Sequence, residues 1–391
     1  MACNVAVLRW LPPAQIGIWL TLQVVEAYAL WIRLGVLNAM NREYPFLLGR
    51  GKDAEAVAHV QAAGAYMGAC AIAVAGGFGA AAWVWAERGP DWQWALAAYA
   101  VQAGGGVWRS FLEGTFRGGS DFRKLAVVQL VGAALQVATL PLVALAGFRG
   151  FCCRAVALVV VITGLLHALR PVRAVWRWSR GILARLLVDG LPLFAANYLS
   201  AISAQFPRVL LAAAGGTALL GLYAPAAAVF TLGAMLPGTL LTFMLPGQNH
   251  AYGRHGDARA IATAAWRQAL ALSALLLPLG LAGVWLLPPL VRAWFPDYAP
   301  GAHVLGWAAV GAALAPLRLA TSVFSTLKAW RPMLAHALLG LALAWLGPWL
   351  WLRADGGDPL RAVVLGSVAA LVAHAAAAWP CVRWAVREAA A

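Results

Sequence analysis

Three arginines, Arg33, Arg208 and Arg318, lie inside long apolar runs of the chain. A guanidinium group pairs with phosphate or carboxylate through two parallel hydrogen bonds, so arginine is well suited to hold such an anion. A charge at the centre of a membrane helix costs at least about 2.5 kcal/mol, and it therefore faces protein or water rather than lipid. If the runs cross a membrane, these arginines predict a hydrated, positively charged cavity.

The run that contains Arg33 carries two more polar side chains. Gln23, Glu26 and Arg33 stand at i, i+3 and i+10, which places them on one face of a helix. Glu26 is a carboxylate near the middle of its run. We predict either an ion-coupling site for a proton or sodium, or a partner for an arginine on a neighbouring helix. Arg33 lies near a helix end, so it either lines the cavity or extends to the lipid headgroups.

The other two arginines also share predicted helix faces with polar residues. Asn197 lies eleven positions before Arg208. Ser322 and Ser325 follow Arg318 at i+4 and i+7. We predict that these faces line a cavity between the two halves of the protein. The predicted substrate-binding residues are Arg33, Arg208, Arg318, Asn197 and Gln23, and the predicted ion-coupling residue is Glu26.

The composition is that of a membrane protein. Of the 391 residues, 63% are hydrophobic and 11% are charged, whereas soluble proteins carry about 25% charged residues. The apolar runs recur along the whole chain and are continuous rather than alternating, so they predict helices and exclude a β-barrel. We therefore predict an all-α polytopic membrane protein. Complete spans are expected at 14–38, 56–86, 92–113, 125–147, 154–170, 190–214, 219–245, 262–287, 301–327, 332–352 and 361–381.

An internal repeat relates the two halves of the chain. Gly17 and Gly221 open similar apolar runs and are 204 positions apart. At this offset the polar loops 49–56 and 253–260 are identical at five of eight positions. We infer that one half is a copy of the other, inserted in the same direction, so that the halves are parallel repeats.

The repeat divides the chain into an N-terminal helical lobe at 1–175, a basic cytoplasmic linker at 176–189 and a C-terminal helical lobe at 190–391. Subtracting the offset from the first span of the second lobe gives a counterpart that starts before residue 1. We therefore expect the chain to begin partway along its first helix, and the restored arrangement has six spans in each lobe.

The positive charge of the chain is concentrated in its loops. The formal net charge is +15, which in a soluble protein would suggest nucleic acid. Here most loop lysines and arginines belong to one alternate set of loops, which is typical of the cytoplasmic side of a membrane protein. No nucleic-acid partner is expected. The set includes Arg383 and Arg387, so the C-terminus is predicted to be cytoplasmic.

The sequence lacks the motifs that would support catalysis. It has no G-x-x-x-x-G-K-[ST] phosphate loop. Its five cysteines have no metal-ligand spacing, and its seven histidines show no H-x-x-x-H pattern. We expect no enzyme activity, no metal and no cofactor. A membrane polymerase or acyltransferase of the cell envelope would need catalytic groups in the outer loops, and these loops are short.

Five short motifs resemble those of bacterial polysaccharide flippases, in the same order along the chain. They are PPAQIGIW at 12–19, DGLPL at 189–193, LGLYA at 220–224, PGQNHAYGR at 246–254 and FPDY at 295–298. The chain is thus similar to the superfamily that unites multidrug exporters, lipid II flippases and O-antigen or capsule flippases. Gln15 departs from the family, which usually has tyrosine at this position.

The resemblance implies a fold and a function. The implied fold is two six-helix bundles in a V around a central cavity, with the first helix truncated. The implied function is to move an undecaprenyl-pyrophosphate-linked oligosaccharide across the bacterial cytoplasmic (inner) membrane by alternating access, for O-antigen lipopolysaccharide or other envelope polysaccharide. The expected partners are this lipid-linked oligosaccharide, membrane lipids and a coupling proton or sodium ion.

The alternative on the same fold is a multidrug or cation antiporter of the MATE type. A cationic substrate would require carboxylates in the cavity, and Glu26 is the one carboxylate near the middle of a predicted span. The arginines favour an anionic substrate.

Overall fold

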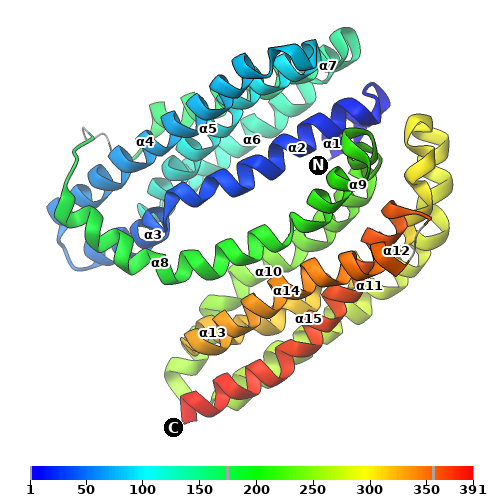
Figure 1. Cartoon of the computed structure of the whole chain (residues 1–391). Helices are drawn as coiled ribbons and strands as arrows, with labels where there is room; N and C mark the ends of the chain where they lie inside the picture. Colours follow the sequence, from blue (N-terminus) through cyan, green and yellow to red (C-terminus); the bar gives the residue numbers. More distant parts are fainter. Residues whose placement is uncertain (1, 173–175, 355–356, 391) are drawn as a thin grey trace. The chain divides into compact units, whose positions relative to one another are not determined.

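The structure is a computed structural model that describes residues 2–172, 176–354 and 357–390. These residues form helices joined by short turns, and they contain no β-strand (Figure 1). The all-α architecture predicted from the composition is therefore confirmed.

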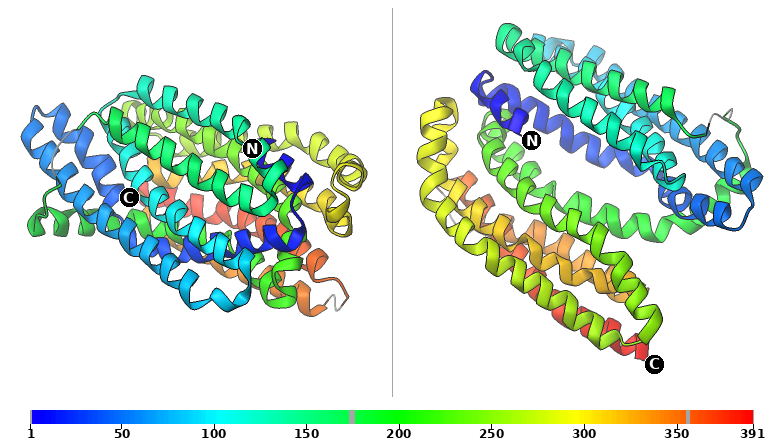
Figure 2. Two further views of the ribbon diagram at one scale, coloured as in Figure 1. Left: turned by 90° about the horizontal axis from the view of Figure 1, so that it is seen from above. Right: turned by 180° about the vertical axis from the view of Figure 1, so that it is seen from behind.

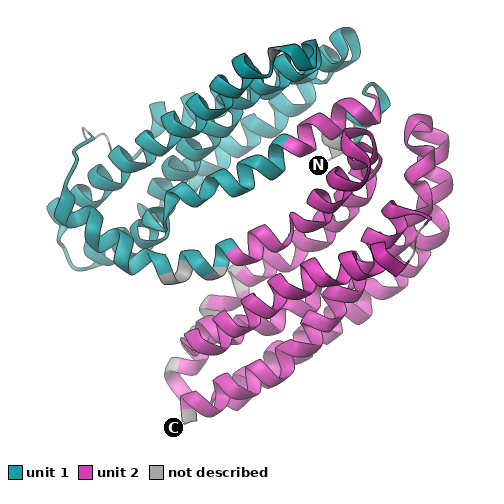
Figure 3. Cartoon of the chain, viewed as in Figure 1, with its two compact units in different colours: residues 1–11, 22–198 teal, residues 12–21, 199–391 magenta. Residues whose placement is uncertain are grey.

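The chain forms two compact units (Figure 3). Unit 1 consists of residues 1–11 and 22–198, and unit 2 consists of residues 12–21 and 199–391. Two helices, α2 (Pro13–Ala29) and α8 (Arg180–Ser203), contribute residues to both units.

Unit 1 is built from the helices of the first half of the chain. Besides parts of α2 and α8, its elements are α1 (Ala2–Ala6), η1 (Val7–Arg9), η2 (Leu30–Arg33), α3 (Val36–Gly49), α4 (Asp53–Val84), η3 (Ala86–Arg88), α5 (Pro90–Gly118), α6 (Phe122–Ala138) and α7 (Leu140–Leu169). Among them α4 packs against α5, α5 against α7, and α3 against α4 (Figures 1 and 2).

Unit 2 holds the helices of the second half. Its elements are α9 (Phe206–Leu222), α10 (Ala224–His255), α11 (Ala258–Trp294), η4 (Pro296–Val304), α12 (Leu305–Leu314), η5 (Ala315–Thr321), α13 (Ser322–Thr326), α14 (Trp330–Ala354) and α15 (Pro359–Ala390). Here α14 packs against α15, and α12 packs against both α10 and α11.

Aspartates begin three of these helices. The Asp257 carboxylate accepts hydrogen bonds from the first backbone N–H groups of α11, and Asp358 does the same for α15. Asp121 caps α6, and hydrogen bonds from the side chain and backbone of Lys124 lower the pKa of its carboxyl. An aspartate at this position satisfies N–H groups that have no partner within the helix.

Nine helical segments of the described residues are long and apolar enough to cross a membrane. They are Pro13–Arg33, Asp53–Val84, Leu140–Leu169, Asn197–Leu222, Ala224–Leu241, Ala258–Trp294, Pro296–Thr326, Trp330–Ala354 and Pro359–Ala389. The predicted spans 92–113 and 125–147 are not among them. Helix α5 covers the first but mixes glutamines and an arginine with its apolar residues. Helix α6 has only 17 residues before Thr139 interrupts it.

The boundary between the units differs from the predicted lobes. Helix α8 begins at Arg180, so residues 180–189 of the predicted linker 176–189 are helical and continuous with the following apolar run. Trp176 of that linker packs edge-on against Trp108 and Phe111 of α5, which ties this segment to unit 1.

Two repeat-related glycines bring α2 and α9 into direct backbone contact within unit 2. A Cβ atom at Gly17 would overlap the backbone of Thr217, and a Cβ atom at Gly221 would overlap the backbone of Pro13. Thr217 and Pro13 are separated by the same 204 positions as the two glycines. The contact is therefore reciprocal, and it requires glycine on both sides.

We predict that Gly17→Ala destabilises the protein by about 1–3 kcal/mol, the cost of forcing an extra methyl group into a packed contact. Thermal unfolding of the purified protein in detergent measures the effect. Gly76→Ala is the matched control, since Gly76 lies in α4 and has nothing within 4 Å of an added Cβ. Equal unfolding temperatures for the two variants would contradict the backbone contact.

Candidate functional site

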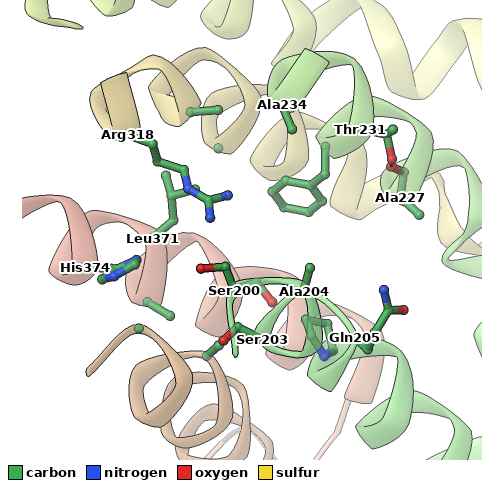
Figure 4. Close-up of a pocket in the computed structure, with 18 of the residues that line it drawn as sticks. Ser200, Ser203, Ala204, Gln205, Ala227, Thr231, Ala234, Arg318, Leu371 and His374 are labelled. Carbon is green, nitrogen blue, oxygen red and sulfur yellow. Dashed lines mark hydrogen bonds between the residues drawn. The ribbon is translucent and has the colours of Figure 1, made fainter. Parts of the chain in front are cut away.

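Unit 2 contains a cavity of about 380 Å³ (Figure 4). It is formed by α9, α10, α12, η5, α14, α15 and the last residues of α8, and alanine and glycine supply much of its wall. Two of the predicted substrate-binding residues, Arg208 and Arg318, lie in this wall. The other polar residues of the lining are Ser200, Ser203, Gln205, Tyr223, Thr231, Ser367 and His374.

Arg208 is positioned by the break between α8 and α9. Helix α8 ends at Ser203, and α9 begins at Phe206 with Pro207 in its first turn, where proline is tolerated because no N–H partner is lost. The Arg208 Nη1 donates a hydrogen bond to Gln205 Oε1 at 3.1 Å. Gln205 thus holds the guanidinium group at the edge of the cavity.

Asn197, another predicted substrate-binding residue, is not among the described residues of the cavity lining. Its spacing to Arg208 assumed one continuous α-helix, whereas α8 ends at Ser203 and α9 begins at Phe206 after a turn. Asn197 is an exposed residue of unit 1, whereas Arg208 belongs to unit 2.

Arg318 projects into the cavity from η5 (Figure 4). It lies deep among protein atoms, yet its side chain stays exposed because the cavity opens around it. Its backbone oxygen accepts a hydrogen bond from the Thr321 hydroxyl, but its guanidinium group has no hydrogen-bond or ion-pair partner among the described residues. Ser322 and Ser325 are absent from the lining that the structure describes, because residues 315–321 form a 3-10 helix with fewer residues per turn than an α-helix.

The cavity has a positive electrostatic character. Two arginines line it, and no carboxylate is among its described lining residues. The described carboxylates of unit 2 lie at or near helix ends, at Asp257, Asp297, Asp358 and Glu388. Guanidinium groups without a protein carboxylate favour an anionic ligand.

A stacked pair of histidines lies beside Arg318. His336 of α14 and His374 of α15 have ring centroids 3.9 Å apart, and His374 lines the cavity. Gly340 makes room for the pair, because a Cβ there would lie 2.5 Å from the His374 ring. The sequence analysis missed this pair, since the two residues are 38 positions apart. The available signal was a single histidine within each of two apolar runs, since ionisable residues are rare inside membrane helices.

The remaining predicted site residues lie in unit 1. Glu26 Oε2 accepts a hydrogen bond of 2.6 Å from the Tyr99 hydroxyl of α5. Arg33 of η2 is close enough to attract Glu26, although no ion pair within 4.0 Å forms between them. The Arg33 Nε is buried and has no hydrogen-bond partner among the described residues. Gln23 is half-buried on the same helix as Glu26, three residues before it.

The described residues contain no group of three or more His, Cys, Asp or Glu side chains that could hold a metal ion.

Comparison with known proteins identifies relatives of this chain. The profile of the family described as "Polysaccharide biosynthesis protein" matches residues 98–296, which is half of the sequence. No curated protein sequence matches the chain significantly.

Solved structures share its fold over almost the whole chain. The inward-facing conformation of a multidrug resistance MATE family transporter of the MOP superfamily matches with a TM-score of 0.77 and 16% identity, covering 99% of this chain and 94% of the other. The outward-facing conformation of such a transporter matches with a TM-score of 0.65 and 16% identity, covering 99% and 92%. A MOP superfamily transporter from Pyrococcus furiosus Vc1 matches with a TM-score of 0.64 and 17% identity, covering 100% and 92%.

We predict that Tyr99→Phe lowers the stability of unit 1 by about 1–3 kcal/mol, because Glu26 loses the hydroxyl that satisfies it. Chemical or thermal unfolding in detergent measures the change. Tyr28→Phe is the matched control, because the structure gives the Tyr28 hydroxyl no hydrogen bond to a described residue. If both variants unfold alike, the Tyr99 hydroxyl does not support Glu26.

Proposed function

The chain belongs to the polysaccharide biosynthesis protein family, and from this premise we propose that it is a flippase for a lipid-linked oligosaccharide. The substrate is an undecaprenyl-pyrophosphate-linked oligosaccharide, moved across the bacterial cytoplasmic membrane for O-antigen or another envelope polysaccharide. The chain is a multi-pass membrane protein with the fold of MATE transporters, a fold in which transport rather than catalysis is the expected activity.

The observation that carries this proposal is the positive cavity of unit 2. Arg208 and Arg318 line it, and no carboxylate is among its described lining residues. The linkage between the polyprenyl tail and the sugar is a pyrophosphate diester with two fixed negative charges. Arginine suits such a group because its planar guanidinium binds two phosphate oxygens at once.

The rest of the lining suits a sugar. Hydroxyl and amide groups of Ser200, Ser203, Gln205 and Thr231 supply hydrogen-bond donors and acceptors. A volume of about 380 Å³ is within the range of small-molecule sites, so it accommodates a pyrophosphate and the adjoining sugar. The polyprenyl tail is apolar and stays in the lipid.

One observation favours a role for unit 1 in coupling. Glu26 is a carboxylate of a membrane-spanning helix, half-buried and held by the Tyr99 hydroxyl. Intramembrane carboxylates commonly bind transported ions. We therefore keep Glu26 as the proposed site for a coupling proton or sodium ion, with Arg33 and Gln23 beside it on the same run. A MATE-like cation antiporter would also use such a carboxylate, but the cavity of unit 2 offers none among its described residues.

We predict that Arg318→Ala reduces translocation of the lipid-linked oligosaccharide by about tenfold or more, because a charge-assisted hydrogen bond contributes about 1.5–3 kcal/mol. Transfer of the labelled lipid between leaflets of proteoliposomes measures the rate. Arg331→Ala is the matched control, since Arg331 is exposed at the start of α14 and outside the described lining. Loss of dye efflux with oligosaccharide transfer intact would favour the cation antiporter instead.

We predict that Glu26→Gln abolishes the response of transport to an imposed proton or sodium gradient, because the amide cannot carry the negative charge. The amide still accepts the Tyr99 hydrogen bond, so the fold is retained. The same proteoliposomes, with and without a gradient, give the measurement. An unchanged gradient response in the variant would remove Glu26 from the coupling mechanism.

A further inference from the structure

The hydrogen bonds of the histidine pair, His336 and His374, determine whether three of its four ring nitrogens act as donor or acceptor. His336 Nε2 lies 3.2 Å from the backbone oxygen of His374. His374 Nε2 lies 3.0 Å from the backbone oxygen of His336 and 3.1 Å from His336 Nδ1. Carbonyl oxygens only accept, so both rings carry their hydrogen on Nε2, and His336 Nδ1 is an acceptor facing the His374 Nε2–H.

The fourth nitrogen, His374 Nδ1, has no hydrogen-bond partner among the described residues. His374 is also the member of the pair that lines the cavity, whereas the His336 ring packs against Phe324. The unpaired basic nitrogen therefore belongs to the ring that a ligand or water in the cavity can reach.

Apart from His374, no described residue of the cavity lining has a side chain of a type that ionises near neutral pH. Arg318 of η5 is the charged residue that acts on the pair, and Arg208 of α9 lines the same cavity. Tyr223 lines the same cavity but its phenol titrates far above neutrality. Helices α12 and α13 carry no ionisable side chain, and the described carboxylates of unit 2 lie at or near helix ends.

We propose that His374, supported by His336, is a proton-binding site that is linked to anion binding in the cavity of unit 2. This inference rests on the proposed function, because the linked ligand is the pyrophosphate group of the substrate. The site is separate from Glu26, which lies in unit 1.

The direction of the linkage follows from charge. A proton on His374 Nδ1 adds a positive charge to a cavity that already holds two arginines, and without an anion these charges repel one another. A bound pyrophosphate removes that penalty. The anion therefore binds more tightly when His374 is protonated, and by thermodynamic reciprocity the bound anion draws a proton onto the pair. Because the stacked rings are so close, the pair takes up one proton rather than two.

The test uses a probe whose own charge is constant. A water-soluble short-chain prenyl-pyrophosphoryl sugar is a pyrophosphate diester, and its two charges do not titrate between about pH 5 and pH 8, the range in which histidine does. Isothermal titration calorimetry of the purified full-length protein in detergent gives the Kd across this range. Repeating the titration in two buffers of different ionisation enthalpy gives the number of protons taken up on binding.

For the unaltered protein we expect the Kd to fall by about tenfold from the alkaline to the acidic end of the range, an ordinary strength for coupled sites. Net proton uptake should accompany binding. His374→Gln keeps a donor for the His336 carbonyl but cannot be protonated, so its Kd should not change with pH and its binding should take up no proton. His303→Gln is the control: His303 contacts Pro300 and Asp358 outside the described cavity lining, and this variant should retain the pH dependence.

The outcomes separate this inference from the proposed function. A pH-independent Kd and no proton uptake in the unaltered protein would overturn the linkage while leaving the anion site intact. Retained pH dependence in His374→Gln would also overturn it. No binding of the probe at any pH would instead remove the pyrophosphate substrate on which both depend. If His374→Gln does not fold, proton uptake by the unaltered protein decides the question alone.

Discussion

A guanidinium group in an apolar surrounding must reach water, a counter-charge or an anion, and this requirement governs the site in unit 2. Arg208 and Arg318 meet it in the same way, because each stands where regular α-helix gives way to another backbone form. Arg208 follows the break after α8, and Arg318 lies in the 3-10 segment η5. Irregular backbone is tolerated at membrane depth where it lines a cavity. The same cavity therefore accounts both for the two arginines and for the interruptions of the α-helices beside them.

The features that could be predicted from the sequence depend on local composition. Continuous apolar runs fix the all-α architecture, since each helix satisfies its own backbone hydrogen bonds. The cost of a buried charge singled out Arg33, Arg208 and Arg318; the last two line the cavity of unit 2, whereas Arg33 belongs to unit 1. This cost is a property of a residue and its immediate neighbours, so it can be read without knowing how the helices pack.

The features that could not be predicted depend on departures from regular helix or on distant contacts. The sequence pattern placed Asn197 and Arg208 on one helix, but a turn at residues 204–205 separates α8 from α9, and of the two only Arg208 is in the described cavity lining. Tyr99 and Glu26 are 73 positions apart, and the histidine pair is 38 apart. Such contacts arise from packing between α2 and α5 or between α14 and α15, which no pattern within one helix encodes.

The reciprocal contact of Gly17 and Gly221 bears on the history of the chain. Gly17 touches Thr217, and Gly221 touches Pro13, which is the repeat counterpart of Thr217. The two sides of the contact are therefore equivalent surfaces. Two separate copies of a half-length polypeptide could form the same contact across a two-fold axis, as in an isologous dimer. Gene fusion would then have preserved an association that existed before the halves were joined, and it would explain why the glycine was kept in both.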